Sequence, residues 1–556
     1  MIISFRLAAV RPDDSMTTRA LLTAGTPWTT ARAWLKQPRN VLVLLVLLGL
    51  AIRVSCILWG IPIQRYVGRY HADEGSAYRH AVGFPGNYSS NIYFDYGTTL
   101  PYLVAVLVLP LKSFVTSSTY ELICWMGLRI VSVLTGTGGI AIVYLLGKRL
   151  YDARTGLLAA ALLAFSFSHC MNSSYANFDV PISFLALLCF MLVLRALDRD
   201  RVRDFIYLGV AAGILIGTKL TMIIVLAIPL VAVLIARTSR REEPTRTFQA
   251  EVGRGAICVA IALAIFVISN FHVVRNFAAF VAHWKQQKYL WYDRSTVPLT
   301  QVPGIWWRYT IAAMGAPTVV LALIGVFRLG RRDVALKVAM VVFLVAHFVL
   351  LRHHFYSRSA VEIAPLACLL AARACTSFMD YRIAKPVAYA AAAFAVMVSL
   401  TMSCRGVIAR LDDPRTKAAR FLAKELPAGS TIGIVSIYRS PIVASWQWPA
   451  LDLTRLRQID FLQMPEYLID TSTNKDIMIS ALRSEKLGTN DIWDPAFNRD
   501  WYNYEPPPPR VFQFYRDLLN GTGSYTLIKS FEPRNADLTI EFGNVGIRVY
   551  KRSSAG

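Results

Sequence analysis

The chain lacks the short motifs that soluble enzymes use to bind metals and nucleotides. Its eight cysteines form no Cys-x-x-Cys pair, and neither a His-x-x-x-His spacing nor a glycine-rich phosphate loop is present. These absences give no support to a divalent metal site and argue against a transporter driven by ATP hydrolysis on this chain. Charged residues are also scarce, at 17% of 556 residues, whereas hydrophobic residues make up 55%. This apolar excess disfavours a soluble enzyme.

Cysteine usage gives no sign of a disulfide framework. Nearly all eight cysteines fall in or beside apolar runs, so we interpret them as small buried hydrophobes. The region after Cys404 contains none and must fold without disulfides.

Long apolar runs recur through the first 400 residues, for example Val41 to Trp59 and Val338 to Leu351. A bilayer-spanning helix needs about 17 to 25 such residues. The sequence therefore predicts a polytopic α-helical membrane protein with about eleven transmembrane helices. The predicted spans are 41–60, 126–147, 155–175, 180–196, 204–219, 220–236, 255–274, 309–329, 334–351, 359–376 and 386–403.

The net charge of +24 arises from short basic clusters between apolar runs. No single stripe collects this charge, which disfavours nucleic-acid binding. The clusters instead fit the positive-inside rule, with a cytoplasmic segment at 1–40 and the C-terminal region on the outer face. The clusters are Lys148-Arg149, Arg199 to Arg203, Arg237 to Arg246 and Arg328 to Arg332.

The predicted domains are a transmembrane domain at 41–403, with outer loops at 61–125 and 275–308, and an extracytoplasmic α/β domain at 404–556. Thr99 to Val115 is apolar but short and interrupted by prolines, so we expect a membrane-surface or partly inserted helix on the outer face. Tryptophans and tyrosines in loop 275–308 fit either an aromatic belt or a contact with a lipid substrate. In the tail we expect strands at 431–437, 525–531 and 546–550 and helices at 416–425, 477–486 and 511–519.

Acidic residues gather on the predicted outer face. Asp73 and Glu74 follow the first span, Asp95 lies among aromatic residues before Thr99, and Asp179 begins the fourth span. Each is individually compatible with a solvated loop or a helix cap. Their convergence on one face favours a site for proton abstraction or ligand binding.

Basic residues on the same face oppose the topological bias. Lys219 lies between two apolar runs, and a short loop holds Arg352, His353, His354, Tyr356 and Arg358. Snorkelling from a span end is one interpretation. The other is an anionic partner, such as the phosphate of a lipid, which we favour for the loop.

The order of these motifs resembles that of the GT-C superfamily of polytopic glycosyltransferases, and within it the protein O-mannosyltransferases and the lipid A aminoarabinose transferases. The likeness covers roughly the first 430 residues. It rests on Asp73-Glu74 after the first span, on Asp179, on Lys219 and on the loop that ends at Arg358. The second motif, Asp95-Tyr96-Gly97-Thr98, departs from the Lys/His-Pro-Pro that follows the acid or histidine in many relatives.

The resemblance implies transfer of a sugar from a polyprenyl-phosphate donor to an acceptor hydroxyl, with inversion. Asp73 would be the general base, and Glu74 would orient it or the acceptor. Asp95 and Asp179 would position the sugar or acceptor. The lipid phosphate would be bound by a basic cluster. That cluster comprises Lys219, Arg352, His353 and Arg358, and His354 and Tyr356 beside it would also bind the substrate.

The expected partners are a lipid-linked sugar and a protein, glycolipid or polysaccharide acceptor, with no nucleic acid. No cofactor is expected, and a divalent metal is possible but not required. The composition and the tail favour a bacterial inner membrane, with the active site facing the periplasm. The alternative is a transporter or flippase for a lipid-linked or anionic solute, although no internal repeat is evident.

Overall fold

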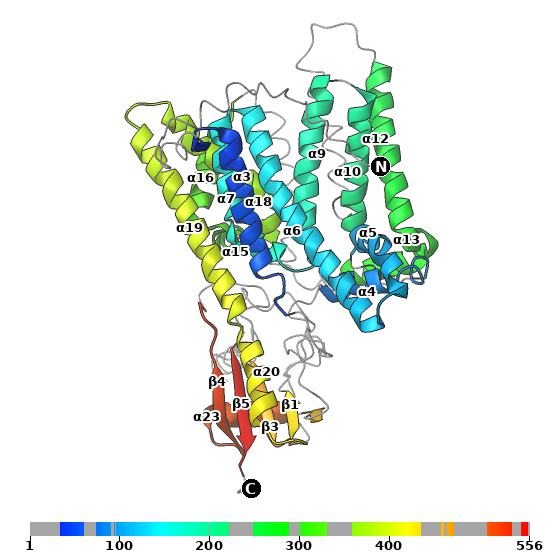
Figure 1. Cartoon of the computed structure of the whole chain (residues 1–556), viewed down its shortest axis with the longest axis vertical. Coiled ribbons are helices and arrows are strands. Elements are labelled where there is room, and N and C mark those ends of the chain that lie inside the picture. Colours follow the sequence, from blue (N-terminus) through cyan, green and yellow to red (C-terminus); the bar gives the residue numbers. More distant parts are fainter. Residues whose placement is uncertain are drawn as a thin grey trace, which may run out of the picture.

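A computed structural model of the chain shows a helical bundle joined to a small sheet domain at one end (Figure 1). This architecture confirms the predicted fold class, a polytopic helical membrane protein with a C-terminal α/β domain. The structure describes residues 34–60, 74–90, 94, 96–199, 201–220, 222, 248–288, 300, 302–330, 359–434, 457–460, 464–471, 509–535 and 546–553.

Six helices in the described part of the chain are long and apolar enough to cross a membrane. The longest, α6, has 34 residues and is therefore about 51 Å long, well beyond a hydrocarbon core of about 30 Å. It extends beyond the bundle at the end that faces the sheet domain, where it contacts α4 and α5. The six are α3 (Pro38–Ser55), α6 (Ser117–Leu150), α9 (Asp179–Arg199), α12 (Phe248–Ser269), α18 (Ser359–Met379) and α19 (Lys385–Leu411).

Two predicted spans are broken in the structure. Span 155–175 consists of α7 (Ala153–Ala164) and α8 (Phe167–Ser173), which meet at 60°. Span 309–329 was predicted as one straight helix. The structure instead bends by 114° between α15 (Val302–Met314) and α16 (Ala316–Phe327), at Gly315, whose φ of +81° suits glycine. Counting each pair as one span gives eight candidates among the described residues.

The other predicted spans coincide with helices or lie outside the described residues. Span 204–219 corresponds to α10 (Val202–Thr218), which packs along α12. Apart from residues 220 and 222, spans 220–236 and 334–351 lie outside the described part of the chain.

The break between α7 and α8 leaves helix-end carbonyls that lipid cannot hydrogen-bond. Arg53, on α3 and fully buried, donates to the carbonyl oxygens of Leu163 at 3.2 Å and Ala164 at 3.1 Å. It also contacts Nδ1 of His169 at 3.0 Å. An arginine inside the first span thus stabilises the broken one.

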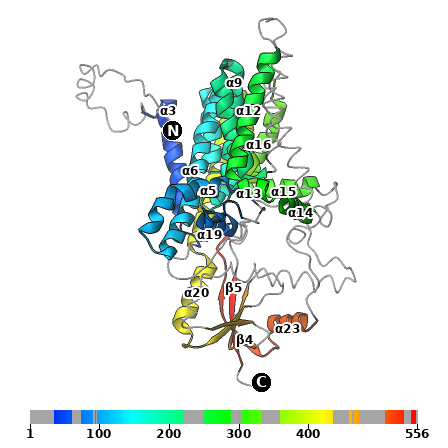
Figure 2. The ribbon, with the colours of Figure 1, turned by 90° about the vertical axis from the view of Figure 1, so that its right-hand side faces the viewer.

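The short elements between the spans lie at the end of the bundle that faces the sheet domain (Figures 1 and 2). Helix α5 has ten residues, about 15 Å, and is too short to cross a bilayer. Together with the 3-10 helix that follows it, α5 forms the apolar helix Thr99–Ser113, which is shorter than the candidate spans. The membrane-surface position expected for this segment stays a prediction. These elements are α4 (Glu74–Gly83), α5 (Thr99–Val108), the 3-10 helix η1 (Leu109–Ser113), α13 (Phe271–Arg275) and α14 (Phe277–Lys288).

The C-terminal domain is a five-stranded mixed sheet in the order β2-β1-β3-β5-β4. Strand β1 runs parallel to β2 and β3, and β5 runs antiparallel to β3 and β4. Ala418 and Leu422 of α20 pack on Ile432, Ile469 and Val549 of the sheet. The expected helix 477–486 lies outside the described residues. The elements are α20 (Pro414–Glu425), β1 (Thr431–Ile434), β2 (Arg457–Asp460), β3 (Tyr467–Thr471), α23 (Pro509–Asn520), β4 (Tyr525–Phe531) and β5 (Ile547–Arg552).

Candidate active site

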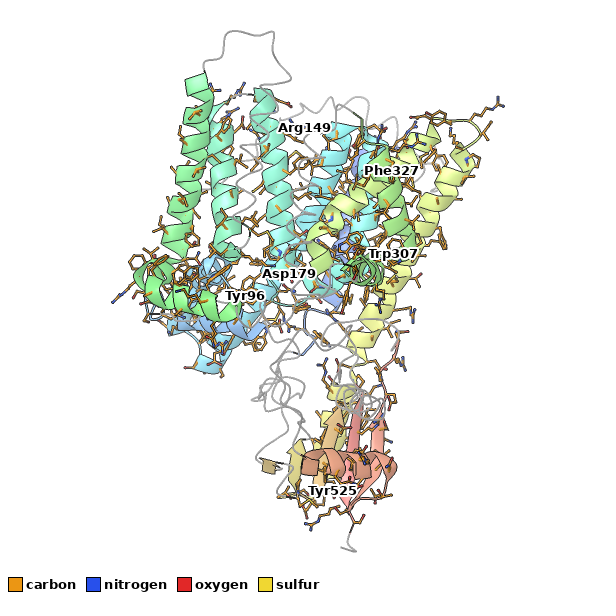
Figure 3. All side chains as sticks on the ribbon, turned by 180° about the vertical axis from the view of Figure 1, so that it is seen from behind. Tyr96, Arg149, Asp179, Trp307, Phe327 and Tyr525 are labelled. Carbon is orange, nitrogen blue, oxygen red and sulfur yellow. The ribbon has the colours of Figure 1, made fainter. Side chains whose placement is uncertain are left out.

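Three of the predicted site residues lie in the described part of the chain: Glu74, Asp179 and Lys219. All three belong to the end of the bundle that faces the sheet domain, and Figure 3 shows Asp179 there near Tyr96, with Arg149 at the opposite end. The predicted residues outside the described part are Asp73, Asp95, Arg352, His353, His354, Tyr356 and Arg358. Their assigned roles stay predictions.

Lys219 joins two carboxylates from different spans. Its Nζ lies 2.6 Å from Oε1 of Glu362 on α18 and 3.4 Å from Oδ1 of Asp179 at the start of α9. Both carboxylates are about 95% buried, whereas the lysine side chain is 27% exposed. Buried charges within a membrane-spanning bundle are costly unless they are paired. The two ion pairs of Lys219 therefore offset the cost of burying Asp179 and Glu362. The sequence placed Asp179 and Lys219 in one site, and the structure brings them together.

The turn before α9 fixes the position of Asp179. Its backbone N–H donates to Oδ1 of Asn177 at 2.6 Å, and Nδ2 of Asn177 donates to Oδ1 of Asn172 at 2.9 Å. The hydroxyl of Tyr175 also donates to Oδ1 of Asn172. Side-chain amides therefore replace the missing helical hydrogen bonds between α8 and α9, and they hold Asp179 in one orientation.

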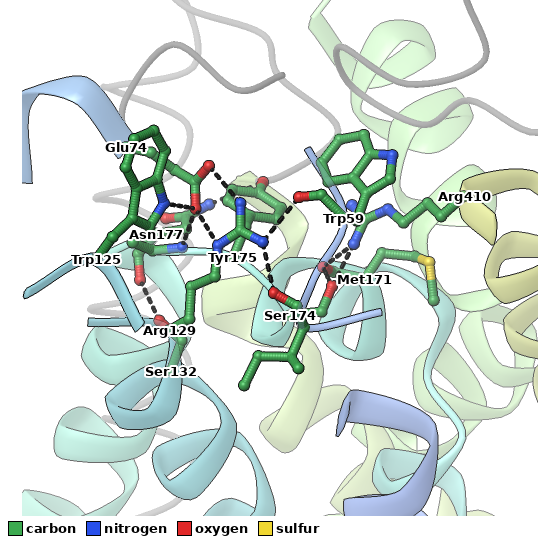
Figure 4. Close-up of polar contacts among 12 residues, drawn as sticks. Trp59, Glu74, Trp125, Arg129, Ser132, Met171, Ser174, Tyr175, Asn177 and Arg410 are labelled. Carbon is green, nitrogen blue, oxygen red and sulfur yellow. Dashed lines mark hydrogen bonds and ion pairs between the residues drawn. The ribbon is translucent and has the colours of Figure 1, made fainter. Parts of the chain in front are cut away.

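Glu74 forms a fully buried ion pair with Arg129 of α6 (Figure 4). Nε and Nη2 of Arg129 donate to its two carboxylate oxygens, each at 2.8 Å, in a bidentate arrangement. Oε1 also accepts from Nε1 of Trp125 at 3.3 Å and from the N–H of Ala176 at 2.7 Å. Glu74 thus ties the start of α4, directly after Asp73, to the turn that carries Asp179.

Trp59 extends the same network to the start of α20, the first helix of the C-terminal domain. Figure 4 shows Trp59 beside Arg129 and Arg410. The carbonyl of Trp59 accepts from Nη1 of Arg129 at 2.7 Å, and its Nε1 donates to Oδ2 of Asp413 at 2.9 Å. The guanidiniums of Arg410 and Arg415 lie 4.2 and 5.4 Å from its ring centroid, close enough for cation–π contacts. The start of α20 is therefore connected to the Glu74 ion pair.

Two buried histidines lie on the short helices α4 and α13 beside this site. The ring centroids of His80 on α4 and His272 on α13 are 6.4 Å apart, and His272 stacks on Phe94. Burial lowers the pKa of His80 to about 3, with His272 and Arg79 adding to the effect, and burial lowers the pKa of His272 to about 4. Both rings are therefore neutral in the folded protein at pH 7.

These lowered pKa values predict a loss of stability in acid. A histidine in the unfolded chain protonates near pH 6.5, so between about pH 6.5 and pH 4 only the unfolded state takes up these protons. Stability should fall across that window. His272→Phe, which keeps a flat ring against Phe94, should make the fall shallower. Unfolding temperatures of the two proteins at pH 7 and pH 4.5 test this, and equal falls would contradict it.

Among the described residues, no group of three or more His, Cys, Asp or Glu side chains lies close enough together to hold a metal ion. The expectation that no metal is required stays a prediction.

Sequence reasoning missed two charged members of the site. Arg129 and Glu362 both lie inside or beside apolar runs that were assigned only as spans, yet each pairs with a predicted residue. A charge within a span is itself a signal of a buried partner. That signal was available in the sequence.

Comparisons with known proteins agree with this architecture. Residues 125–269 match the family model described as dolichyl-phosphate-mannose-protein mannosyltransferase. The structure resembles an oligosaccharyltransferase from Archaeoglobus fulgidus, with a TM-score of 0.51 and 12% identity over 92% of this chain and 88% of that one. It also resembles ArnT from Cupriavidus metallidurans in complex with undecaprenyl phosphate, with a TM-score of 0.49 and 12% identity over 79% and 94% of the two chains. Among curated proteins, none matches.

The fold of this chain is thus that of the polytopic GT-C glycosyltransferases. The predicted resemblance to that superfamily is confirmed by the family model, whose match spans α6 to α12, and by the fold.

Proposed function

We propose that this protein is a membrane glycosyltransferase that transfers a sugar from a polyprenyl-phosphate donor to an acceptor hydroxyl. The observation that carries the proposal is the meeting of distant motifs around Asp179. Glu74 binds the turn that precedes Asp179, and Lys219 pairs both with Asp179 and with Glu362. The match to a family named for dolichyl-phosphate-mannose donors supports a lipid phosphate as the carrier.

In the proposed reaction, the acceptor oxygen attacks the anomeric carbon while the bond from that carbon to the phosphate oxygen breaks. Asp73 takes the proton of the acceptor hydroxyl, and the lipid phosphate leaves with the bonding electrons. A single displacement of this kind inverts the anomeric configuration. We assign to Glu74, which is itself fixed by Arg129, the role of orienting Asp73 or the acceptor, while Asp95 and Asp179 position the sugar or the acceptor.

The departing phosphate develops negative charge that hydrocarbon cannot solvate. We assign its stabilisation to the basic residues Lys219, Arg352, His353, His354 and Arg358, with Tyr356 as a hydrogen-bond donor. We further propose that the site and the C-terminal domain face the periplasm of a bacterial inner membrane. Both lie at one end of the bundle, as that topology requires.

A transfer assay tests the function. The full-length protein in liposomes receives polyprenyl-phosphate hexoses or pentoses together with peptide, glycolipid and polysaccharide acceptors. Release of free lipid phosphate with glycosylation of one acceptor is the expected result. If no donor is consumed and a labelled lipid crosses the bilayer instead, the protein is a flippase and the proposal is wrong.

Arg358→Ala should weaken donor binding more than acceptor binding. A hydrogen bond to a charged group contributes about 1.5 to 3 kcal/mol, so the apparent KM for the donor should rise by about tenfold or more. The matched control is Arg382→Ala, an exposed arginine after α18. An unchanged donor KM in the Arg358 variant would remove that residue from phosphate binding.

A further inference from the structure

The end of α10 has an unusual arrangement of hydrogen bonds. Helix ends leave their last carbonyls without partners inside the helix. At this end, Nδ2 of Asn270 donates to the carbonyl of Gly217 at 3.1 Å, and the N–H of Gly97 donates to the carbonyl of Thr218 at 3.1 Å. Lys219 follows at once in an extended conformation, with φ −147° and ψ 108°. Hydrogen bonds from two other segments, at Asn270 and Gly97, therefore fix the backbone at the end of α10.

Asn270 connects all three segments. Its side chain, in a residue only 1% exposed, accepts from the N–H of Thr98 at 2.9 Å through Oδ1. It also lies 3.3 Å from Oγ1 of Thr99 through Nδ2, in addition to its bond to Gly217. One amide thus joins the end of α12, the start of α5 and the end of α10.

Two glycines allow this contact. A Cβ built on Gly97 would lie 1.9 Å from the carbonyl oxygen of Gly217. A Cβ on Gly217 would lie 2.1 Å from Oγ1 of Thr99 and 2.9 Å from Nδ2 of Asn270. Side chains at either position would separate the two backbones. The glycine in the 96–99 loop is therefore required by the position of α10.

The same loop also contacts the other side of the ion cluster. The ring of Tyr96 packs on Phe178 with centroids 4.9 Å apart, and Phe178 directly precedes Asp179. Residues 96–99 consequently contact the segments that carry both Asp179 and Lys219.

We propose that Asn270 is a positioning residue for Lys219. By fixing the carbonyl of Gly217 and the backbone of Thr98, it sets the direction in which Lys219 leaves α10 and aims its Nζ at Asp179 and Glu362. The proposal deepens the proposed function, because it assigns the geometry of a phosphate-binding cation to an amide that contacts no reacting atom.

The first test measures the reactivity of the lysine itself and needs no catalysis. Full-length protein in detergent is treated with an amine-labelling reagent, and modification of Lys219 is followed by mass spectrometry. Asn270→Ala should increase the labelling rate of Lys219 several-fold. Asn270→Asp, which keeps the acceptor for Thr98 but loses the donor to Gly217, should do the same and serves if the alanine variant does not fold. Labelling at the wild-type rate in the folded variants would overturn the proposal.

The control for this test is Thr376→Val. Thr376 is also buried, and its hydroxyl hydrogen-bonds that of Thr155 at 2.8 Å. It lies on α18 fourteen residues after Glu362, which is about 21 Å along the helix. Loss of a buried hydrogen bond at that distance should leave Lys219 labelling unchanged. An increase equal to that of Asn270→Ala would show general loosening and also overturn the proposal.

A double-mutant cycle gives the second test. Asn270→Ala should lower kcat/KM for the donor by about tenfold while leaving the acceptor KM unchanged. In a Lys219→Met background it should have little further effect, because the two residues act in series. Equal losses in both backgrounds would contradict the positioning role. A wild-type protein that transfers no sugar would refute the proposed function alone, since the labelling test still decides on Asn270.

Discussion

Asp73→Asn should abolish sugar transfer while the protein folds normally. A positioned general base contributes about 10²- to 10⁴-fold to a rate, and an amide cannot accept the acceptor proton. The neighbouring structure should survive the change, because the start of α4 is held by the Glu74–Arg129 ion pair and by the bond from the N–H of Ala176. Donor turnover in liposomes and the unfolding temperature in detergent are the measurements.

The matched control for Asp73→Asn is Glu121→Gln, which neutralises an exposed carboxylate near the start of α6. It should keep wild-type turnover. Near-normal turnover in the Asp73 variant would exclude that carboxylate as the base. A loss of turnover with a lowered unfolding temperature would indicate misfolding, and transfer by Asp73→Glu would then be the deciding measurement.

Of the substitutions predicted in this protein, Arg129→Met should cause the largest decrease in the free energy of unfolding. It leaves the carboxylate of Glu74 fully buried without its bidentate partner, which costs about 3 to 5 kcal/mol. The double variant Glu74→Met with Arg129→Met removes both charges and should recover most of this stability. Unfolding in detergent, followed by intrinsic fluorescence, gives the comparison.

Arg149→Met provides the contrasting case. Arg149 pairs with Asp198 at the opposite end of the bundle, where the two side chains are 27% and 64% exposed. Exposed pairs contribute about 0 to 1 kcal/mol, so this variant should unfold close to the wild-type temperature. If Arg129→Met and Arg149→Met lower the unfolding temperature equally, the buried Glu74–Arg129 pair contributes no more to stability than the exposed pair.

Hydrophobic length and charge placement were sufficient to predict most of the fold. The apolar run at 126–147 and the basic pair that follows it correspond to α6. The predicted spans 41–60, 180–196 and 386–403 likewise overlap α3, α9 and α19. The bend at Gly315 was missed, although a glycine shortly before Pro317 was a local signal for it. In the tail, β2 was missed because Arg457–Asp460 is short and polar, and β3 because its apolar pair is only Leu468 and Ile469.

The candidate site was only partly predictable. Asp179 and Lys219 were grouped correctly because counting spans places both on one face. Arg129, Glu362 and Asn270 depend on which helix packs against which, and that information arises only when the spans assemble. Motif order therefore predicted that Asp179 and Lys219 belong to one site, whereas the residues that hold them in place required the structure.

Arg53 has a consequence for how the protein is made. It lies in the first span, yet the carbonyls that it binds belong to Leu163 and Ala164, 110 and 111 residues later. Arg53 lies in the last turn of α3, and an unpaired arginine in a membrane helix is costly, by about 2.5 to 3.5 kcal/mol on the insertion scale when it lies at the helix centre. The carbonyl partners of Arg53 on α7 are made only after α6, so these hydrogen bonds cannot form until α7 has been synthesised. The packing of the first helix is therefore completed by a helix made much later in the chain.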